Sequence, residues 1–520
     1  MSDSRLPGRG ADPGQESPGD RPVSRARPAT GSSGKRTGRF SGQLPGPGRH
    51  VTEPPRNPSG LCAIGSTHAR AGATEPPEEP TGLPAAERAG PTDADGTEPF
   101  GEPTGSTGRL QRRIGLADAV LLGLGSMLGA GVFAAFGPAA HAAGAGVLVG
   151  LAIAAVIAYC NAMSSAQLAS LYPESGGTYV YGRRRLGARW GFVAGWGFVA
   201  GKTASCAAMS LTVGAYAWPQ HPRPVAVAAA ALLTMVNYFG VSKTARLTRA
   251  LVILTLLALA VVVVACLAGG TARTARLSPF WSGSGLDAVR GVLQAAALLF
   301  FAFAGYARIA TLGEEVRDPA RTILKAIPTA LGITIVVYVL VGLSALLAVG
   351  PERLANAVDP LAAATGAGSL SVLTPAVRVG GAVASLGVLL SLLAGVGRTA
   401  LAMARERDLP NWLAAVHPRY AVPHRAELLL GGIVIAVVIA SDVRGAIGFS
   451  SFAVLVYYAI ANASAFTLDG PRRRWLRPLS LLGGVGCLVL ALMLPAASVL
   501  TGFAVLAIGV VIRAVRRPCA

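Results

Sequence analysis

The chain has 520 residues, of which 52% are hydrophobic and only 14% are charged, whereas soluble domains usually carry about 25% charged residues. This composition excludes an ordinary soluble protein and indicates an integral membrane protein. The net charge of +20 does not indicate a nucleic-acid partner: residues 1–108 hold 12 Lys/Arg and 13 Asp/Glu, so the excess lies in the apolar region. The six cysteines form no C-x-x-C pair, so the sequence predicts no disulfide framework, metal site or cofactor.

Residues 1–108 are crowded with Pro, Gly, Ser, Arg and Glu and hold almost no aromatic or branched residues. Such a segment cannot bury enough apolar surface to offset the entropy lost on ordering. We predict a disordered cytoplasmic N-terminal tail. A partner-docking role and a gene start placed upstream of the true Met are both compatible with this segment.

Twelve apolar windows follow, most of them near the length that crosses about 30 Å of hydrocarbon. The sequence therefore predicts an all-α integral membrane protein with twelve transmembrane helices. The windows are 116–138, 146–171, 190–217, 224–240, 249–268, 289–311, 326–349, 378–400, 427–441, 446–468, 478–494 and 496–514.

Basic residues are concentrated in every second connection between these windows. The connections after the even-numbered windows, together with the segment after the last one, hold 22 Lys/Arg, whereas the alternate connections hold 7. Lys and Arg are enriched on the cytoplasmic side of membrane proteins. We therefore predict a multi-pass protein of the cell membrane with both termini in the cytoplasm.

The first window contains a glycine run in its middle: residues 123–133 read GLGSMLGAGVF. Each glycine in a helix interior costs about 1 kcal/mol relative to alanine. One interpretation is that Gly125 and Gly129 form a G-x-x-x-G face for close helix packing. The other is that the helix breaks here and its unpaired peptide groups hold a ligand at the bilayer midplane.

The sixth window has a similar centre, since residues 299–306 read LFFAFAGY. Gly305 lies five helices after Gly125, and an odd offset means that the two helices cross the membrane in opposite directions. This is the relationship between the lead helices of an inverted repeat. Taken together, the two glycine segments favour a transporter over simple packing.

Four sequence blocks make the comparison with known families specific. GLGSMLGAGVF, then YPESGGTYVYGRRRLG at 172–187, FFAFAGYARIATLGEEVRDPARTI at 300–323 and RTALAMARERDLPNWLAAVHPRYAVPHRA at 398–426 resemble the amino acid–polyamine–organocation superfamily of permeases. The resemblance covers residues 109–515. It implies a five-plus-five inverted repeat of the LeuT type, with repeat one at about 116–268, repeat two at about 289–468 and two additional helices at about 478–514.

The resemblance also implies a substrate site between the broken first and sixth helices. Backbone N–H groups of the first break would bind an amino acid carboxylate, and carbonyl groups of both breaks would accept hydrogen bonds from its ammonium. Phe301 or Phe303 would cover the substrate; a lipid-facing or core position is the alternative for each ring. The residues implied are Ser126, Met127, Leu128, Gly129, Ala130, Gly131, Phe303, Ala304 and Gly305.

Two positions depart from the superfamily pattern. A carboxylate often follows the Gly-aromatic pair of the sixth helix, and Ala307 stands there instead, which removes one counter-charge for a cationic substrate. Thr255 occupies the place of the fifth-helix lysine of proton-coupled relatives. That coupling mechanism therefore cannot be transferred to this chain.

Lys202 lies 12 residues beyond Trp190, which at about 1.5 Å per residue places it roughly 18 Å into the third helix. An intramembrane lysine suggests a function, such as shuttling a proton or holding the broken helices together; snorkelling along the helix is the alternative. Near the end of the sixth helix, Glu314 and Glu315 are candidates for an inner gate with Arg183, although a solvated charge cluster is equally compatible.

The sequence thus predicts a secondary active transporter and not an enzyme. We expect alternating-access, proton-coupled uptake of neutral or broad-range amino acids, with the amino acid, protons and the lipid bilayer as partners. One alternative is a cationic amino acid or polyamine exchanger, and another is a non-transporting amino acid receptor on the same fold.

Overall fold

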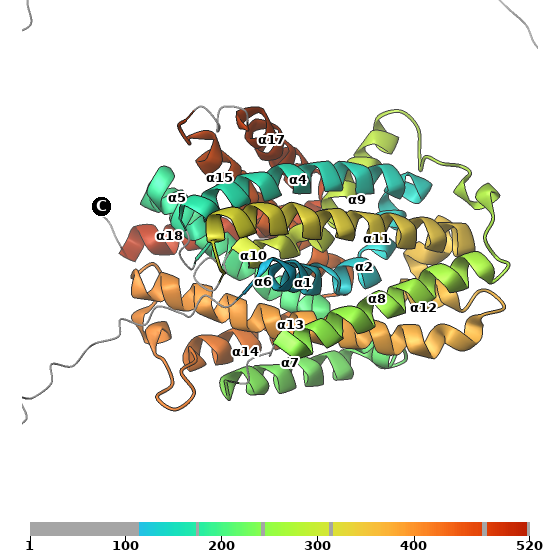
Figure 1. Cartoon of the computed structure of the whole chain (residues 1–520), viewed down its shortest axis with the longest axis horizontal. Coiled ribbons are helices and arrows are strands. Elements are labelled where there is room, and N and C mark those ends of the chain that lie inside the picture. The colour runs from blue at the N-terminus through green and yellow to red at the C-terminus, as the bar shows by residue number, and fades with distance from the viewer. Residues whose placement is uncertain (1–113, 173–175, 241–244, 311–315, 471–475, 517–520) are drawn as a thin grey trace, which may run out of the picture. The chain divides into compact units, whose positions relative to one another are not determined.

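The computed structural model describes residues 114–172, 176–240, 245–310, 316–470 and 476–516 (Figure 1). The predicted tail at 1–108 therefore lies outside the described residues. Regular structure in the described ranges is helical, apart from an isolated bridge between Ile114 and Val316. The elements are α1 (Leu116–Met127), α2 (Ala130–Ala134), α3 (Phe136–Ala143), η1 (Gly144–Gly146), α4 (Val147–Leu171), α5 (Thr178–Arg185), α6 (Ala188–Ala217), α7 (Pro222–Tyr238), α8 (Ala245–Ala268), η2 (Thr274–Leu277), α9 (Leu286–Phe303), η3 (Ala304–Tyr306), α10 (Ala307–Ala310), α11 (Pro319–Asn356), α12 (Pro360–Thr365), η4 (Ser371–Leu373), α13 (Thr374–Arg405), η5 (Asn411–Ala414), α14 (His424–Ala440), α15 (Val443–Phe466), α17 (Arg477–Met493) and α18 (Ala496–Arg516).

Each of the twelve predicted windows is helical over most of its described length, although the first and the sixth are interrupted. Eight helical segments of the described chain are long and apolar enough to cross a membrane, and α17 is a shorter apolar helix. The helix α6 is not among the eight although it has 30 residues, because Lys202 and several Gly, Ser and Thr residues lower its hydropathy. The all-helical membrane class is confirmed, whereas the count of twelve spans is not.

The helix α6 packs against α13 and α15 through small residues. A Cβ atom added at Gly201 would lie 2.8 Å from the Cβ of Ala453, and one at Gly195 would lie 2.8 Å from the Sδ of Met403. Small residues at such positions let membrane helices approach closely enough for dispersion contacts to hold them together. The glycines of α6 therefore allow this helix to pack closely against both neighbours.

Two other groups of helices complete the framework around α6. The helices α4, α9 and α11 run side by side, and α7 lies beside α14 (Figure 1). The long helix α11 is kinked at Gly350, whose φ of 77° and ψ of 168° interrupt the helical geometry. Pro351 follows directly, and proline cannot continue the hydrogen-bond pattern of the preceding turn.

A buried polar network attaches α17 to the rest of the chain. The amide of Asn462 on α15 donates to Oδ1 of Asn161 on α4 at 2.5 Å, and Asn161 donates to the Sγ of Cys487 on α17 at 3.1 Å. One turn along, the hydroxyl groups of Ser164 and Ser480 lie 3.0 Å apart. Hydrogen bonds of this kind stabilise helix association in lipid by about 0.6 kcal/mol each on average.

Candidate functional site

The first predicted break is present in the structure. The helix α1 ends at Met127, Leu128 leaves the helical region with a ψ of 82°, and α2 begins at Ala130. Gly129 between them has a φ of −153° and a ψ of −140°. The first residues of a helix have N–H groups without an intrahelical acceptor, so Ala130 and Gly131 present such donors at the break.

The glycines around the break also serve packing, but each meets a different helix. A Cβ atom at Gly125 would lie 3.0 Å from Val252 on α8, and one at Gly129 would lie 2.6 Å from Val388 on α13. A single G-x-x-x-G partner helix is therefore the wrong description. The run combines a chain break with close contacts to several neighbours.

The second break lies directly against the first. The helix α9 ends at Phe303 and continues as the tight turn η3 before α10 begins at Ala307. A Cβ atom at Gly305 would overlap the carbonyl group of Ser126 and would lie 2.7 Å from the backbone nitrogen of Met127. Glycine at this position therefore allows the two unwound segments to touch backbone to backbone.

Carbonyl groups released by the breaks receive hydrogen bonds from tyrosines. The hydroxyl group of Tyr338 on α11 lies 2.7 Å from the carbonyl oxygen of Met127 and 3.0 Å from that of Ala302. The hydroxyl group of Tyr458 on α15 lies 3.3 Å from the carbonyl oxygen of Ala304. Such donors are needed because lipid cannot hydrogen-bond an exposed peptide group.

Lys202 donates to the same segment, since its Nζ lies 3.3 Å from the carbonyl oxygen of Ala304. The lysine is 6% exposed, and it lies on α6, which runs past the second break. The sequence analysis predicts that this lysine lies near the bilayer centre, with holding the broken helices together as one of its possible functions. The structure places it in direct contact with η3.

A cavity of about 340 Å³ lies between the two breaks, α6 and α13. Four of the predicted residues line it together: Ser126, Lys202, Ala304 and Gly305. The other lining residues are Gly176, Phe198, Ala307, Arg308, Val388, Ser391, Leu392, Gly395, Val396, Arg398, Thr399 and Ala402.

The charged side chains of this lining are all basic. Lys202, Arg308 and Arg398 line the cavity, and its described lining contains no Asp or Glu. Opposite charges attract more strongly near a protein interior than in bulk water because the effective dielectric constant is lower. These side chains can therefore attract a carboxylate group in the cavity.

The remaining predicted residues surround the cavity without lining it. Met127, Leu128, Gly129, Ala130 and Gly131 are buried around the first break. Phe301 and Phe303 are also buried, and the Phe303 ring packs 5.1 Å from the ring of Tyr338. The aromatic residue that lines the cavity is Phe198, which sequence reasoning missed because α6 carries several aromatic residues with nothing to distinguish it.

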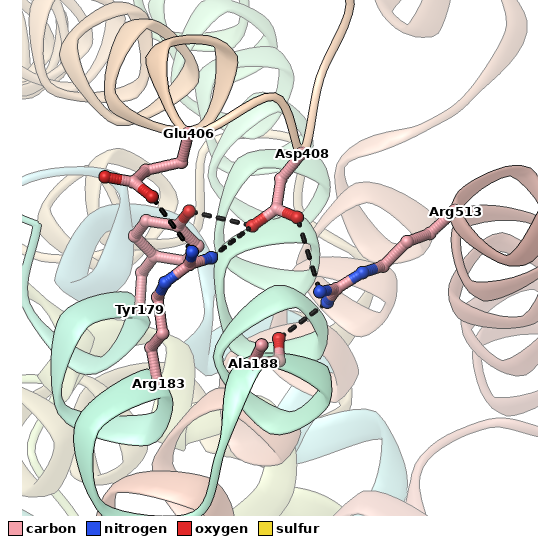
Figure 2. A network of polar contacts seen from close by, with 6 residues as sticks. All are labelled: Tyr179, Arg183, Ala188, Glu406, Asp408 and Arg513. Carbon is pink, nitrogen blue, oxygen red and sulfur yellow. Dashed lines mark hydrogen bonds and ion pairs between the residues drawn. The ribbon is translucent and has the colours of Figure 1, made fainter. Parts of the chain in front are cut away.

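Arg183, predicted as a gate residue, pairs with carboxylates that the sequence did not single out. Its guanidinium lies 2.9 Å from Glu406 and 3.2 Å from Asp408 (Figure 2). The predicted partners Glu314 and Glu315 lie outside the described residues. Glu406 and Asp408 follow the end of α13 within the sequence RERDLP. The alternation of acidic residues with arginines in this stretch was the signal that could have identified them.

The hydroxyl group of Tyr179 on α5 donates to Oδ2 of Asp408 at 2.8 Å. Burial, followed by the hydrogen bond to Asp408, raises the pKa of the Tyr179 phenol well above its usual range. Tyr179 therefore stays protonated at neutral pH and remains a donor to this carboxylate.

A different set of contacts joins α2, α6 and α12. The hydroxyl group of Tyr216 donates to the carbonyl oxygen of Phe133 at 2.7 Å and accepts from the backbone nitrogen of Leu361 at 3.2 Å. Nearby, Asp359 pairs with Arg378 at 2.9 Å. Burial raises the pKa of the Asp359 carboxyl, and Arg378 opposes this shift.

The comparisons with known proteins agree with this architecture. The family model described as amino acid permease matches residues 118–508. The chain is 60% identical over 409 residues to a protein of Mycobacterium tuberculosis described as an uncharacterized transporter, covering 78% of this chain and 92% of that protein. It is 27% identical over 347 residues to the branched-chain amino acid permease BcaP of Bacillus subtilis, covering 62% and 73%.

Among solved structures, the chain is similar to MhsT in complex with L-phenylalanine, with a TM-score of 0.53 and 17% identity over 74% of this chain and 100% of MhsT. At this identity the likeness concerns the fold, which is of the LeuT type. The superfamily resemblance in the sequence is thus confirmed. The chain belongs to the amino acid permease family of the amino acid–polyamine–organocation superfamily, whose members are multi-pass membrane transporters.

Proposed function

We propose that this protein takes up amino acids with neutral side chains by alternating access, coupled to protons. The observation that carries the proposal is the cavity between two touching chain breaks, lined by Ser126, Ala304, Gly305 and Lys202. A site built largely from peptide groups recognises the α-amino and α-carboxylate groups that all amino acids share. A broad range of neutral side chains follows from this mode of recognition.

In this proposal the substrate carboxylate faces the positive side chains and the backbone donors between Ser126 and Gly131, and its ammonium faces the carbonyl groups of Phe303, Ala304 and Gly305. Phe301 or Phe303 covers the substrate when the site closes. The contact between Gly305 and Ser126 supports this arrangement, because it brings donors and acceptors of the two breaks to one place. Two similar proteins point to amino acids with neutral side chains: MhsT was solved in complex with L-phenylalanine, and BcaP is named a branched-chain amino acid permease.

Lys202 is the proposed coupling residue. Its ammonium group braces the Ala304 carbonyl and adds positive charge beside the site for a carboxylate. A bound carboxylate therefore raises the proton affinity of Lys202, and a proton on Lys202 raises carboxylate affinity by the same factor, because coupling between two ligands is reciprocal. This linkage favours movement of proton and amino acid together.

Exchange of cationic amino acids or polyamines is the second candidate. Its support is the family, which contains proteins named cationic amino acid transporters. We rank it second because the charged side chains of the cavity lining are Lys202, Arg308 and Arg398, with no acidic side chain among the described lining residues to bind a cationic group directly. A non-transporting receptor on the same fold is the third candidate.

We further propose twelve transmembrane helices with both termini in the cytoplasm. Four helices outside the eight apolar spans, α6, α7, α14 and α17, complete this number. The first ten helices form two inverted repeats of five, at about 116–268 and 289–468, and the last two follow at about 478–514. The segment 1–108 is a disordered cytoplasmic tail in this proposal.

Uptake of a radiolabelled amino acid panel into proteoliposomes tests the function. We expect uptake of neutral amino acids that rises with an inward proton gradient and is competed weakly by arginine or spermidine. Thermal-shift measurements at two pH values identify ligands in parallel, because a ligand of the folded state raises its stability. Stabilisation without uptake would favour the receptor, and uptake of arginine or polyamines alone would favour the exchanger.

A further inference from the structure

Asp408 is held from opposite sides by two arginines that come from distant parts of the chain (Figure 2). Arg183 on α5 lies 3.2 Å from Oδ2, and Arg513 on α18 lies 3.5 Å from Oδ1. The carboxylate side chain is 0% exposed. A buried carboxylate is costly unless it is paired, so these contacts fix the position of the segment that follows α13.

Arg513 makes a second connection. Its Nη1 donates to the carbonyl oxygen of Ala188, the first residue of α6, at 2.6 Å, and its guanidinium lies 4.9 Å from the centre of the Phe192 ring. The arginine side chain is 13% exposed. Arg513 therefore ties Asp408 to the start of α6 as well as to α18.

The network lies beyond one end of the cavity. On α13 the cavity lining extends to Ala402, and the chain then turns at Arg407, whose φ is 59°. The backbone nitrogen of Asp408 donates to the carbonyl oxygen of Met403 at 2.8 Å, which closes this turn. From the other side the lining includes Gly176, just before α5. The network thus joins the two elements that approach each other at this end.

We propose that α18, a helix outside the two proposed repeats, helps to close the cavity at this end. It does so through the contacts of Arg513. The proposal rests on alternating access. Separation of α5 from the end of α13 breaks the contacts of Tyr179 and Arg183 with Asp408. Arg513 opposes this separation by holding Asp408 against the start of α6, so its removal destabilises the closed arrangement relative to the open one.

Cysteine labelling tests the closure directly. Thr399→Cys places a reporter thiol in the cavity lining. Cys62 and Cys519 are replaced by serine in every variant, and the four cysteines of the described residues are all buried. A membrane-impermeant maleimide is applied to vesicles of each orientation, and the labelling rate is compared between variants. We expect Arg513→Gln to raise the rate about tenfold from one side, which corresponds to about 1.4 kcal/mol.

Arg516→Gln is the matched control, because it removes the same charge from α18 three residues further on, and its rate should equal that of the parent. Arg513→Lys keeps the charge but lacks the fork that spans Asp408 and Ala188, so its rate should also rise. If Arg513→Gln does not fold, the labelling rate of Arg513→Lys tests the proposal in its place. A parental rate in the folded variant overturns the proposal.

The Asp408→Asn background separates this role from a general effect on structure. There Arg513→Gln should cause little further increase, because Asp408→Asn has already removed the ion pair through which Arg513 acts in this proposal. A full tenfold increase in that background contradicts coupling through Asp408. Labelling needs no substrate flux, so the expected rates in a protein that takes up no amino acid would refute the proposed function and leave the closure standing.

Discussion

Gly305 packs directly against the peptide between Ser126 and Met127, with no room for a side chain between the two chain breaks. This contact joins the end of α1 to η3, at the point where each of the two helical segments is interrupted. The relative position of the two breaks, and hence the shape of the cavity, depends on it.

Gly305→Ala should abolish uptake, because the added methyl group must push the carbonyl group of Ser126 and the nitrogen of Met127 away. Substrate-induced thermal stabilisation should be lost with it. Gly332→Ala on α11 is the control, since a Cβ atom there meets nothing within 4 Å, and it should retain parental uptake. Normal uptake by Gly305→Ala would show that the two breaks tolerate separation.

Tyr338→Phe should reduce stability by about 1–3 kcal/mol, the cost of leaving a buried polar group without its partner. The hydroxyl group of Tyr338 serves both breaks, at Met127 and at Ala302. Unfolding of the purified protein measures the effect. The exposed Tyr159 on α4 offers the same chemical change as a control, and equal stability of the two variants would remove the hydroxyl group of Tyr338 from this role.

Lys202→Met should abolish proton-driven uptake while substrate binding partly survives. The change removes the ammonium group from the Ala304 carbonyl and from the cavity lining, but it leaves the peptide groups of the site in place. Uptake with and without a proton gradient, together with thermal shift, separates the two effects. Lys325→Met, at an exposed position of α11, should behave as the parent protein. A proton-dependent uptake unchanged in Lys202→Met would exclude Lys202 as the coupling residue.

Asp359 should make the protein less stable as pH rises above the usual aspartate range. Burial raises the pKa of its carboxyl above the ordinary value of 3.8 in the folded state, so the folded state keeps this proton over a range in which the unfolded chain has lost it. Stability linked to this proton is full below that range and falls as pH rises through it. Unfolding midpoints of wild type and Asp359→Asn between about pH 4 and pH 7 isolate the contribution. A constant difference between the two proteins across this range would contradict the assignment.

The sequence predicted the helices and both breaks because apolar windows and clustered glycines are local signals. Lys202 could be predicted too, because a charged residue within an apolar window is noticeable whichever face of the helix carries it. The remaining lining on α13, such as Ser391 and Thr399, could not be assigned in full, because an apolar membrane helix buried on several sides lacks the polar face that marks its orientation.

The partners of Arg183 show a second limit. The predicted gate partners Glu314 and Glu315 lie outside the described residues, so that prediction stays open. The structure adds Glu406 and Asp408, more than 200 residues away from Arg183, which the sequence analysis did not name. Such pairing depends on how α5 packs against the end of α13, which has no local sequence signal. The contact of Arg513 with the same carboxylate depends in turn on the position of the last helix.

The amide network of Asn161, Asn462 and Cys487 bears on how this protein can be produced. A chain cut before α17 would leave Asn161 of α4 without its hydrogen bond to Cys487, and Arg513 would be missing from Asp408. The helices up to α15 therefore depend on α17 and α18 for these polar contacts. Expression trials, chimaeras and minimal designs of this permease should therefore retain α17 and α18.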